Sequence, residues 1–317
     1  MRLLVTGGSG FIGSNFIESA LSGRPDASVV NADNLTYASI FKPDFEKRFP
    51  NQYKFVKADI SDTAAMAKLC KETDMVVNFA AETHVDNSIS RPLSFVQANV
   101  LGTATLLDAA LKAGHERFFH ISTDEVYGSS EQHFFKETDL LAPSSPYSAS
   151  KAGAEMMVAA YEKTYGIRTT ITRSSNNYGP RQHPEKFIPK AITRLLSGKK
   201  VPVYGAGSNV RDWIHVSDNC DAIGLLVERQ KAGIYNIASG AAMSNIELAR
   251  AIAKIMGKGD GALEFVEDRK GHDFRYAVDA SKIKALGWKP KVNFAKGLEA
   301  TVDWYIKNKK AWTEHAV

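Results

Sequence analysis

Two adjacent carboxylates, Asp124 and Glu125, stand directly after the apolar stretch 117–123. Mutual repulsion between neighbouring carboxylates raises one pKa, so one group can stay protonated while the other is ionised. Such a pair suits general acid–base chemistry, which needs both protonation states in one place. The alternative interpretation is that both residues only cap the turn that follows a strand.

A tyrosine and a lysine four residues apart, Tyr147 and Lys151, occur in the stretch "PYSASK". On a helix both side chains project from one face. A nearby ammonium favours the phenolate form of a tyrosine, so Tyr147 is a candidate base. The alternative is a surface tyrosine beside a solvated lysine.

A glycine loop opens the chain, with Gly7, Gly10 and Gly13 spaced three apart in "VTGGSGFIG". Between a strand and a helix this spacing permits a tight turn, close approach of a pyrophosphate, and helix packing. Asp33 follows twenty residues after Gly13 at the end of the next apolar stretch. A carboxylate there would bind an adenosine ribose and repel a 2′-phosphate, which favours NAD over NADP. A plain turn is the alternative.

Two further strand ends fit a bound dinucleotide. Asp59 and Ile60 stand where an adenine ring would lie, although Asp59 could equally cap the following helix. Ala80 and Ala81 are small and leave room for a cofactor, as they would also do if they merely packed.

Elements that must position these residues alternate between strand and helix over the first half of the chain. This alternation predicts an α/β fold with a Rossmann-type, doubly wound parallel sheet. Strands are expected at 2–6, 28–33, 53–59, 75–81, 117–123 and 168–173, and helices at 11–23, 62–72, 94–114 and 147–166. We expect an NAD-binding domain over 1–174, to which 211–239 return, and a smaller α/β domain over 175–317 that binds substrate.

Composition narrows the class of protein. Hydrophobic residues make up 44% and charged residues 24% of the 317 residues, which is typical of a folded globular chain. The net charge of +5 is spread among 35 acids, so a nucleic-acid partner is not expected. Cys70 and Cys220 lie in no Cys or His cluster, so neither disulfides nor a metal site is expected. We expect a cytoplasmic protein without signal peptide or membrane helix.

The glycine loop together with Tyr147 and Lys151 resembles the extended short-chain dehydrogenase/reductase family. Within it, the stretches "STDEVYG", "SNNYGP", "PEKFIP", "VRDWIHVSDN" and "GHDFRYAVDASKI" resemble the dTDP-glucose 4,6-dehydratases. The resemblance implies NAD as cofactor and a deoxysugar-forming lyase as the activity. Other nucleotide-sugar 4,6-dehydratases, and 4-epimerases or decarboxylases with the same Tyr147 and Lys151, stay open, as does a non-catalytic NAD-binding module.

The resemblance also implies a role for each catalytic side chain. Tyr147, aided by Lys151 and a hydrogen bond from Thr123, would take the proton of the C4 hydroxyl while the C4 hydride passes to NAD. Glu125 would then remove the C5 hydrogen, and Asp124 would protonate the leaving C6 oxygen. Returning the hydride to C6 while C5 is reprotonated regenerates the cofactor.

Binding residues are carried over from the matching motifs. On the cofactor side they are Gly7, Gly10, Phe11, Ile12, Gly13, Asp33, Asp59, Ile60, Ala80, Ala81, Thr83, Tyr147 and Lys151. On the substrate side they are His84, Thr123, Asn176, Asn177, Glu185, Lys186, Phe187, Pro202, Tyr204, Arg211, Asn245, Arg269, His272 and Tyr276. Arg211 and Arg269 are the expected phosphate ligands, because a guanidinium can bind phosphate oxygens in bidentate fashion.

Three departures from the family pattern bear on these expectations. Ser39 and Ile40 in "TYASI", and Ala98, differ on the cofactor side, and Arg181 stands where an aromatic residue is usual. The departure at Arg181 bears on which nucleotide or sugar is bound, more than on the type of reaction. The resemblance implies a homodimer, formed through the helices at 92–114 and 146–165.

Overall fold

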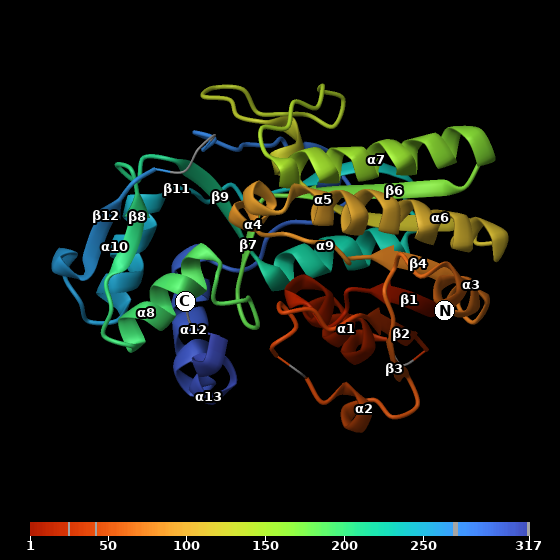
Figure 1. Cartoon of the computed structure of the whole chain (residues 1–317), viewed down its shortest axis with the longest axis horizontal. Coiled ribbons are helices and arrows are strands. Elements are labelled where there is room, and N and C mark those ends of the chain that lie inside the picture. The colour runs from red at the N-terminus through yellow and green to blue at the C-terminus, as the bar shows by residue number, and fades with distance from the viewer. Residues whose placement is uncertain (25, 42, 269–271, 316–317) are drawn as a thin grey trace.

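A seven-stranded parallel sheet organises the larger part of the molecule (Figure 1). The structure is a computed structural model that describes residues 1–24, 26–41, 43–268 and 272–315. In spatial order the strands are β10 (Gly233–Ile237), β6 (Arg168–Ser174), β5 (Arg117–Thr123), β4 (Met75–Asn78), β1 (Arg2–Thr6), β2 (Ser28–Asp33) and β3 (Tyr53–Lys57). This arrangement confirms the predicted Rossmann-type sheet.

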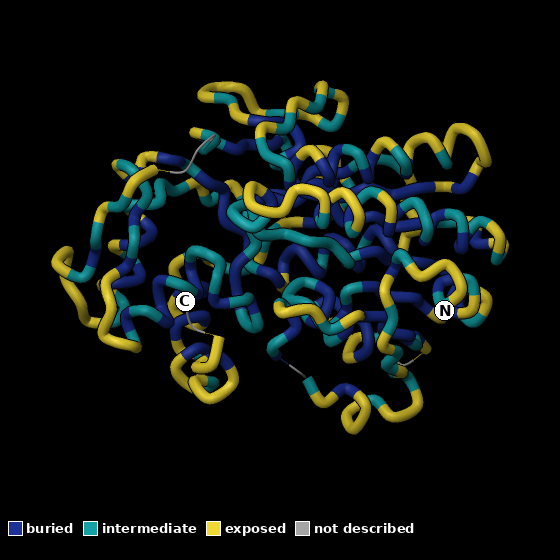
Figure 2. The backbone as a smooth tube through the Cα atoms, viewed as in Figure 1, coloured by how far each residue is buried: buried dark blue, intermediate teal, exposed yellow. Residues whose placement is uncertain are grey.

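Alternate residues of each strand enter opposite cores, because helices cover both faces of the sheet. In β1, Leu3 and Val5 are buried against one helical layer, and Leu4 is buried against the other. The first layer contains α1 (Phe11–Gly23), α9 (Val216–Glu228) and α11 (Ser281–Lys284). The second contains α3 (Thr63–Lys71), α6 (Gly102–Lys112) and α7 (Pro146–Tyr165). Figure 2 shows the strands as the most deeply buried part of the chain.

The strand order changes direction at β1, which pairs with β2 on one side and with β4 on the other. The chain runs outward from β1 to β3, then crosses back to β4 and proceeds through β5 and β6. In an open α/β sheet, such a reversal creates a crevice at the carboxyl ends of the strands, where ligands bind. The loops after β1, β4 and β5 meet at this crevice, which brings the glycine loop close to the paired acids.

A smaller part of the chain lies beside this crevice, at the left of Figure 1. It contains the three-stranded sheet β11 (Ala242–Ser244), β9 (Val210–His215) and β7 (Asn176–Tyr178), and the pair β12 (Leu263–Val266) and β8 (Val201–Tyr204). Four helices pack on these strands, namely α8 (Phe187–Leu196), α10 (Asn245–Ile255), α12 (Phe294–Lys307) and α13 (Lys309–Trp312). Their apolar faces enclose a separate core that contains Trp213, Tyr305 and Trp312.

Some element boundaries differ from the sequence-based prediction. The helix expected over 94–114 is split into α5 (Pro92–Phe95), a π-helical segment (Val96–Leu101) and α6. Two short helices, α2 (Phe45–Arg48) and α4 (Val85–Ser90), were not predicted, and β4 ends before Ala80. Short elements lack the repeated apolar spacing on which such predictions depend.

The division into domains stays a prediction. Within 211–239, α9 and β10 belong to the large sheet and its helical layer, whereas β9 belongs to the small sheet. The chain therefore crosses between the two parts more than once. No helix among the described residues is long and apolar enough to cross a membrane.

Candidate active site

The glycine loop forms a turn that admits no side chain at its tightest points. Gly7 has a φ of 68°, and a Cβ added there would lie 2.6 Å from the backbone nitrogen of Ala80. A Cβ at Gly13 would lie 2.4 Å from the carbonyl oxygen of Gly7, which already accepts a hydrogen bond from the Gly10 amide at 3.1 Å. The turn ends at the N-terminus of α1, whose first amides attract anions.

Asp33 links this turn to the loop after β2. One carboxylate oxygen accepts a hydrogen bond from the Ser9 amide at 2.9 Å, and the other accepts from the Leu35 amide at 2.8 Å. The hydroxyl of Ser39 also donates to this second oxygen, at 3.3 Å. Ser39 is one of the departures from the family pattern, and it thus supports the acid expected to bind a ribose.

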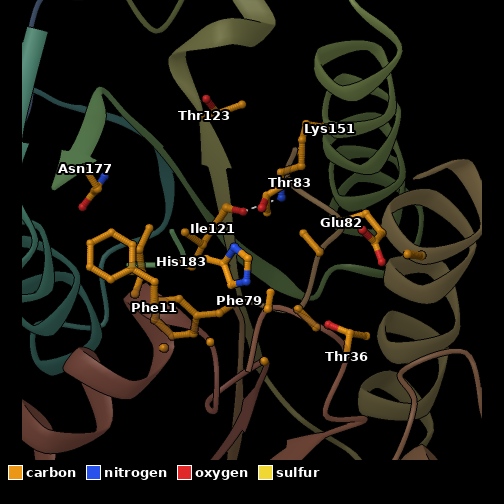
Figure 3. A pocket seen from close by; sticks show the side chains of 18 of the residues that line it. Phe11, Thr36, Phe79, Glu82, Thr83, Ile121, Thr123, Lys151, Asn177 and His183 are labelled. Carbon is orange, nitrogen blue, oxygen red and sulfur yellow. Dashed lines mark hydrogen bonds between the residues drawn. The ribbon is translucent and has the colours of Figure 1, made fainter. Parts of the chain in front are cut away.

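A larger cavity of about 300 Å³ begins at the glycine turn and ends at the paired acids. Figure 3 looks into it, with Thr123 and Lys151 at its upper end and Phe79 and Thr36 at its lower end. Every cofactor-side residue predicted from the sequence lines this cavity: Gly7, Gly10, Phe11, Ile12, Gly13, Asp33, Asp59, Ile60, Ala80, Ala81, Thr83, Tyr147 and Lys151.

The residues around this cavity fit a bound dinucleotide. Glycine positions that a Cβ would fill leave the backbone accessible to a pyrophosphate. Asp59 does not cap α3, because Asp62 is the N-cap and accepts from the amides of Ala64 and Ala65. The side chain of Asp59 instead accepts from Ser61 and Asn34 at the rim of the cavity.

The paired acids lie in the turn after β5, a single 3₁₀ turn over Asp124–Tyr127. Asp124 is buried, and burial raises its pKa well above the ordinary value, with a further rise from the charge of Glu125. Thr123 donates to one oxygen of Asp124 at 3.3 Å. The other oxygen, Oδ2, is buried without a partner among the described residues. Burial therefore favours the protonated form of Asp124, and its Oδ2 is available to a ligand.

Tyr147 and Lys151 come from the first turns of α7. This helix begins there because Ser145 and Ser148 form a reciprocal capping box and Pro146 occupies the first turn. Tyr147 is buried, and its pKa is raised by burial and by the charge of Glu125, while a hydrogen bond with Thr123 lowers it. The three side chains Thr123, Glu125 and Tyr147 therefore meet at one end of the larger cavity.

Lys151 lines the same cavity as Tyr147, and its ammonium is held by the strand β5. Its ammonium donates to the carbonyl oxygen of Ile121 at 2.6 Å (Figure 3), and burial lowers its pKa to about 8. Burial and the charge of Glu125 raise the pKa of Tyr147, so the role of Lys151 in favouring the phenolate stays a prediction. The common face of the helix, however, is confirmed.

A smaller cavity of about 170 Å³ adjoins the larger one, and Glu125, Thr83, Asn176, Glu185 and Lys186 line both. Most substrate-side residues predicted from the sequence line the smaller cavity: His84, Asn176, Glu185, Lys186, Phe187, Pro202, Tyr204, Arg211, Asn245, His272 and Tyr276. Thr123 and Asn177 line the larger one. Arg269 lies outside the described residues.

Arg211 is the buried cation of the smaller cavity. Its guanidinium lies 4.1 Å from the ring centroid of Tyr276 and donates to the carbonyl oxygens of Val210, Asp273 and Phe274 at 2.8 to 3.2 Å. The remaining guanidinium donors stay available to an anion. The carbonyls hold the planar group in place, which reduces the entropy lost on binding.

Arg181 lies away from the positions expected for the nucleotide or the sugar. Its guanidinium binds Glu18 and Asn15 on α1, each at 2.7 Å, and it lines neither cavity. Because Arg181 lines neither cavity, its position gives no reason to expect a different nucleotide or sugar. Ala98 lines the larger cavity, as expected for a cofactor-side departure.

Several residues of the site were missed. Asp273 lines the smaller cavity and accepts from the hydroxyl of Tyr276 at 2.6 Å, and Trp213 lines it with a buried indole N–H that has no partner among the described residues. Gln182 and His183 line the larger cavity. All four lie within or beside stretches already singled out, but only the tertiary structure shows that they face a cavity.

Comparisons with known proteins show the family of this chain. The family model described as GDP-mannose 4,6 dehydratase matches residues 4–301. The low-salt glycan biosynthesis protein Agl12 of Haloferax volcanii is 52% identical over 307 residues, which cover 96% of this chain and 99% of that protein. A dTDP-glucose 4,6-dehydratase of Actinoplanes sp. is 46% identical, with 99% of this chain and 100% of that protein covered.

Solved structures give the same result. The crystal structure of DesIV, a dTDP-glucose 4,6-dehydratase from Streptomyces venezuelae with NAD bound, superposes with a TM-score of 0.94 and 45% identity, covering 99% of each chain. The fold that carries the glycine turn, Tyr147, Lys151 and the paired acids is therefore the fold of that dehydratase. This chain belongs to the GDP-mannose 4,6-dehydratase family, within the extended short-chain dehydrogenases/reductases.

Proposed function

We propose that this chain is an NAD-dependent dTDP-glucose 4,6-dehydratase, which converts dTDP-glucose to dTDP-4-keto-6-deoxyglucose. Relatives that bear this name match the whole chain at 46% identity. The observation that carries the proposal is the buried acid Asp124, with its raised pKa and unpartnered oxygen, next to Glu125 and within the same cavity as Tyr147. Oxidation needs only Tyr147 and its neighbours, whereas elimination of water also needs an acid and a base.

NAD is the cofactor of this reaction, held by the glycine turn, Asp33 and the other residues along the larger cavity. When bound, it supplies the acceptor for the C4 hydride, the same hydride for C6, and a positive charge. Asp33 favours NAD, because its carboxylate would repel a 2′-phosphate.

Oxidation at C4 is assigned to Tyr147. Its phenolic oxygen takes the proton of the C4 hydroxyl, and Thr123 holds it in place through a hydrogen bond. Because burial and Glu125 raise the pKa of Tyr147, the phenolate forms only when positive charge gathers around it. Lys151, fixed on the carbonyl of Ile121, contributes part of that charge.

Elimination of water is assigned to the paired acids. A ketone at C4 acidifies the hydrogen at C5, and Glu125 removes it; C5 is reprotonated when the hydride returns to C6. Asp124 donates its proton to the C6 oxygen as the C–O bond breaks, so water leaves. Burial and the charge of Glu125 raise the pKa of Asp124, which favours the protonated form that a general acid requires.

The substrate's diphosphate and nucleoside are placed in the smaller cavity. Arg211 supplies the cation there, and Tyr204, Asn245 and Tyr276 supply hydrogen-bonding groups around it. The sugar then lies where the two cavities meet, at Glu125.

We infer that the protein works in the cytoplasm as a homodimer. Cys70 and Cys220 are both free and buried, which suits a reducing compartment. Leu93, Val96, Leu101 and Met156 are 49 to 80% exposed on or near α5, α6 and α7, the helices expected at the dimer interface. Sedimentation equilibrium tests this: a Leu101→Asp variant should form monomers, and a wild-type monomer would contradict the proposal.

Product analysis tests the reaction directly. The purified protein is incubated with dTDP-, UDP-, GDP- and CDP-glucose, and products are identified by mass spectrometry. We expect loss of one water from dTDP-glucose, and slower or no conversion of the other sugars. A product of unchanged mass with inverted C4 would identify a 4-epimerase instead.

A further inference from the structure

A buried histidine, His120, lies behind the lysine of the site and has no role in the chemistry assigned above. His120 belongs to β5, and it is 1% exposed. Its Nε2 lies 3.4 Å from the Nζ atom of Lys151, which is itself 4% exposed. Apart from His120, Lys151 has one hydrogen-bond acceptor among the described residues, the carbonyl oxygen of Ile121 at 2.6 Å. A buried ammonium needs several acceptors, because each unsatisfied N–H is costly.

The other ring nitrogen of His120 belongs to a chain of neutral polar groups. Nδ1 lies 3.3 Å from the amide nitrogen Nδ2 of Asn78, at the end of β4. In this orientation of the amide, its oxygen Oδ1 accepts from the hydroxyl of Thr6 at 2.7 Å, and Nδ2 donates to the hydroxyl of Thr103 at 3.2 Å. All of these side chains are buried. These hydrogen-bonded side chains therefore connect β1, β4, β5 and α6 to the lysine of α7.

The partners of the ring determine its tautomer. The ring is neutral, since burial and the charge of Lys151 lower the pKa of His120 well below its ordinary value. In a neutral ring one nitrogen carries the proton and the other accepts. An ammonium at Nε2 requires that nitrogen to accept, so the proton belongs on Nδ1, facing Asn78. An Nδ1–H ring therefore requires the Asn78 amide to be turned by 180°, so that its oxygen faces Nδ1 and Thr103 and its nitrogen faces Thr6. The hydroxyls of Thr6 and Thr103 can each donate or accept, so they allow this orientation.

We propose that His120 is a positioning residue, whose Nε2 accepts a hydrogen bond from Lys151 and so fixes the direction and the charge of that ammonium in the cavity that Tyr147 also lines. The proposal rests on the proposed function only through the role of Lys151. Together with the carbonyl of Ile121, the ring gives the ammonium two acceptors from β5. The sheet, rather than solvent, thus fixes the cation of the site.

Other ionisable groups near Lys151 also influence its pKa. Glu155 lies one turn further along α7 and raises the pKa of Lys151, but its carboxylate is held by Arg173 of β6. Tyr147 of α7, with Asp124 and Glu125 after β5, lines the same cavity. None of these groups has a hydrogen bond to Nζ among the described residues. His120 differs from them because it is a neutral acceptor on a strand of the sheet that contacts Nζ directly.

The tautomer can be observed without any substrate. Long-range ¹H–¹⁵N spectra of histidine-labelled protein distinguish Nδ1–H from Nε2–H rings, and a His120→Gln spectrum assigns the signal. We expect a neutral Nδ1–H ring from pH 5 to pH 9, which changes its tautomer balance in Lys151→Met. An Nε2–H ring in the wild type, or a ring that ignores Lys151→Met, would overturn the proposal.

Two matched variants test the consequence for the reaction. Glutamine can place an oxygen near the position of Nε2 and so keeps an acceptor for Lys151. Asparagine reaches only the position of Nδ1, so it keeps the contact with Asn78 and loses the acceptor. Both truncate the ring, so a purely structural role would affect them alike.

The pH profile of turnover separates them. Lys151 assists only while protonated, so turnover falls as the pH rises through its pKa, near about 8 in the wild type. Loss of one hydrogen bond to the ammonium lowers that pKa, so His120→Asn should move the alkaline limb down by about one pH unit. His120→Gln should keep the wild-type limb.

Identical limbs in both variants would refute the positioning role, even if both variants are slower. The thermal unfolding temperature of each variant is measured alongside, since a structural loss moves this temperature and leaves the limb in place. If the wild type fails to dehydrate dTDP-glucose, the proposed function fails, whereas the tautomer and its response to Lys151→Met still decide the role of His120.

Discussion

Adding a single methyl group at Gly13 should disable the cofactor turn. In Gly13→Ala the new Cβ would lie 2.4 Å from the carbonyl oxygen of Gly7 and 2.9 Å from the Cα of Gly8. Ordinary contacts are about 3.5 Å, so the turn must open by about 1 Å. Overpacking of this kind costs ~1–3 kcal/mol. The same shift displaces the amides that face a pyrophosphate, and loss of one such hydrogen bond lowers NAD affinity roughly tenfold.

Gly23→Ala is the matched control, because it lies at the other end of the same helix and no atom stands within 4 Å of its added Cβ. Alanine there should be neutral or stabilise the helix by up to ~1 kcal/mol. Bound NAD is measured after gel filtration and acid release, and thermal unfolding is followed by circular dichroism. If Gly13→Ala retains NAD and unfolds at the temperature of Gly23→Ala, the glycine turn does not hold the cofactor.

Three further changes probe other parts of the site. Asp33→Ala should weaken the preference for NAD over NADP in calorimetric titrations of cofactor-free protein, and a wild type that prefers NADP would contradict the ribose role. Glu155→Ala leaves the buried Arg173 unpaired and should lower the free energy of unfolding by ~3–5 kcal/mol, against at most ~1 kcal/mol for the exposed Glu116→Ala; equal losses in urea titrations would refute this. Arg211→Leu should raise KM far more than it changes kcat, because uniform binding is lost, and an unchanged KM would remove Arg211 from the phosphate site.

Local motifs account for what the sequence predicted. The glycine spacing, the acids after an apolar stretch and the four-residue interval from Tyr147 to Lys151 each specify a geometry within one turn or one helix. The parallel sheet followed from alternating elements, and the sheet order then brings the ends of β1, β4 and β5 together. The meeting of the glycine turn and the paired acids is a consequence of that order.

The features that the sequence could not predict depend on contacts between segments that are far apart in the chain. The pairing of Lys151 with Ile121 and His120 spans 30 and 31 residues, and that of Arg181 with Glu18 spans 163. The pKa of Tyr147 follows from burial, which depends on how α7 packs on the turn after β5. No interval in the sequence encodes these neighbours.

The central claim is that oxidation and elimination are carried out by different side chains of one cavity. Glu125→Gln keeps the size of the side chain and its hydrogen bonding but removes the base. After rapid mixing with dTDP-glucose, reduced nicotinamide absorbance should rise in this variant, while water loss, followed by mass spectrometry, should slow by roughly 10²–10⁴. Tyr147→Phe should show neither signal at a normal rate. Dehydration by Glu125→Gln at the wild-type rate would contradict the assignment of the base, and with it the division of labour proposed for this site.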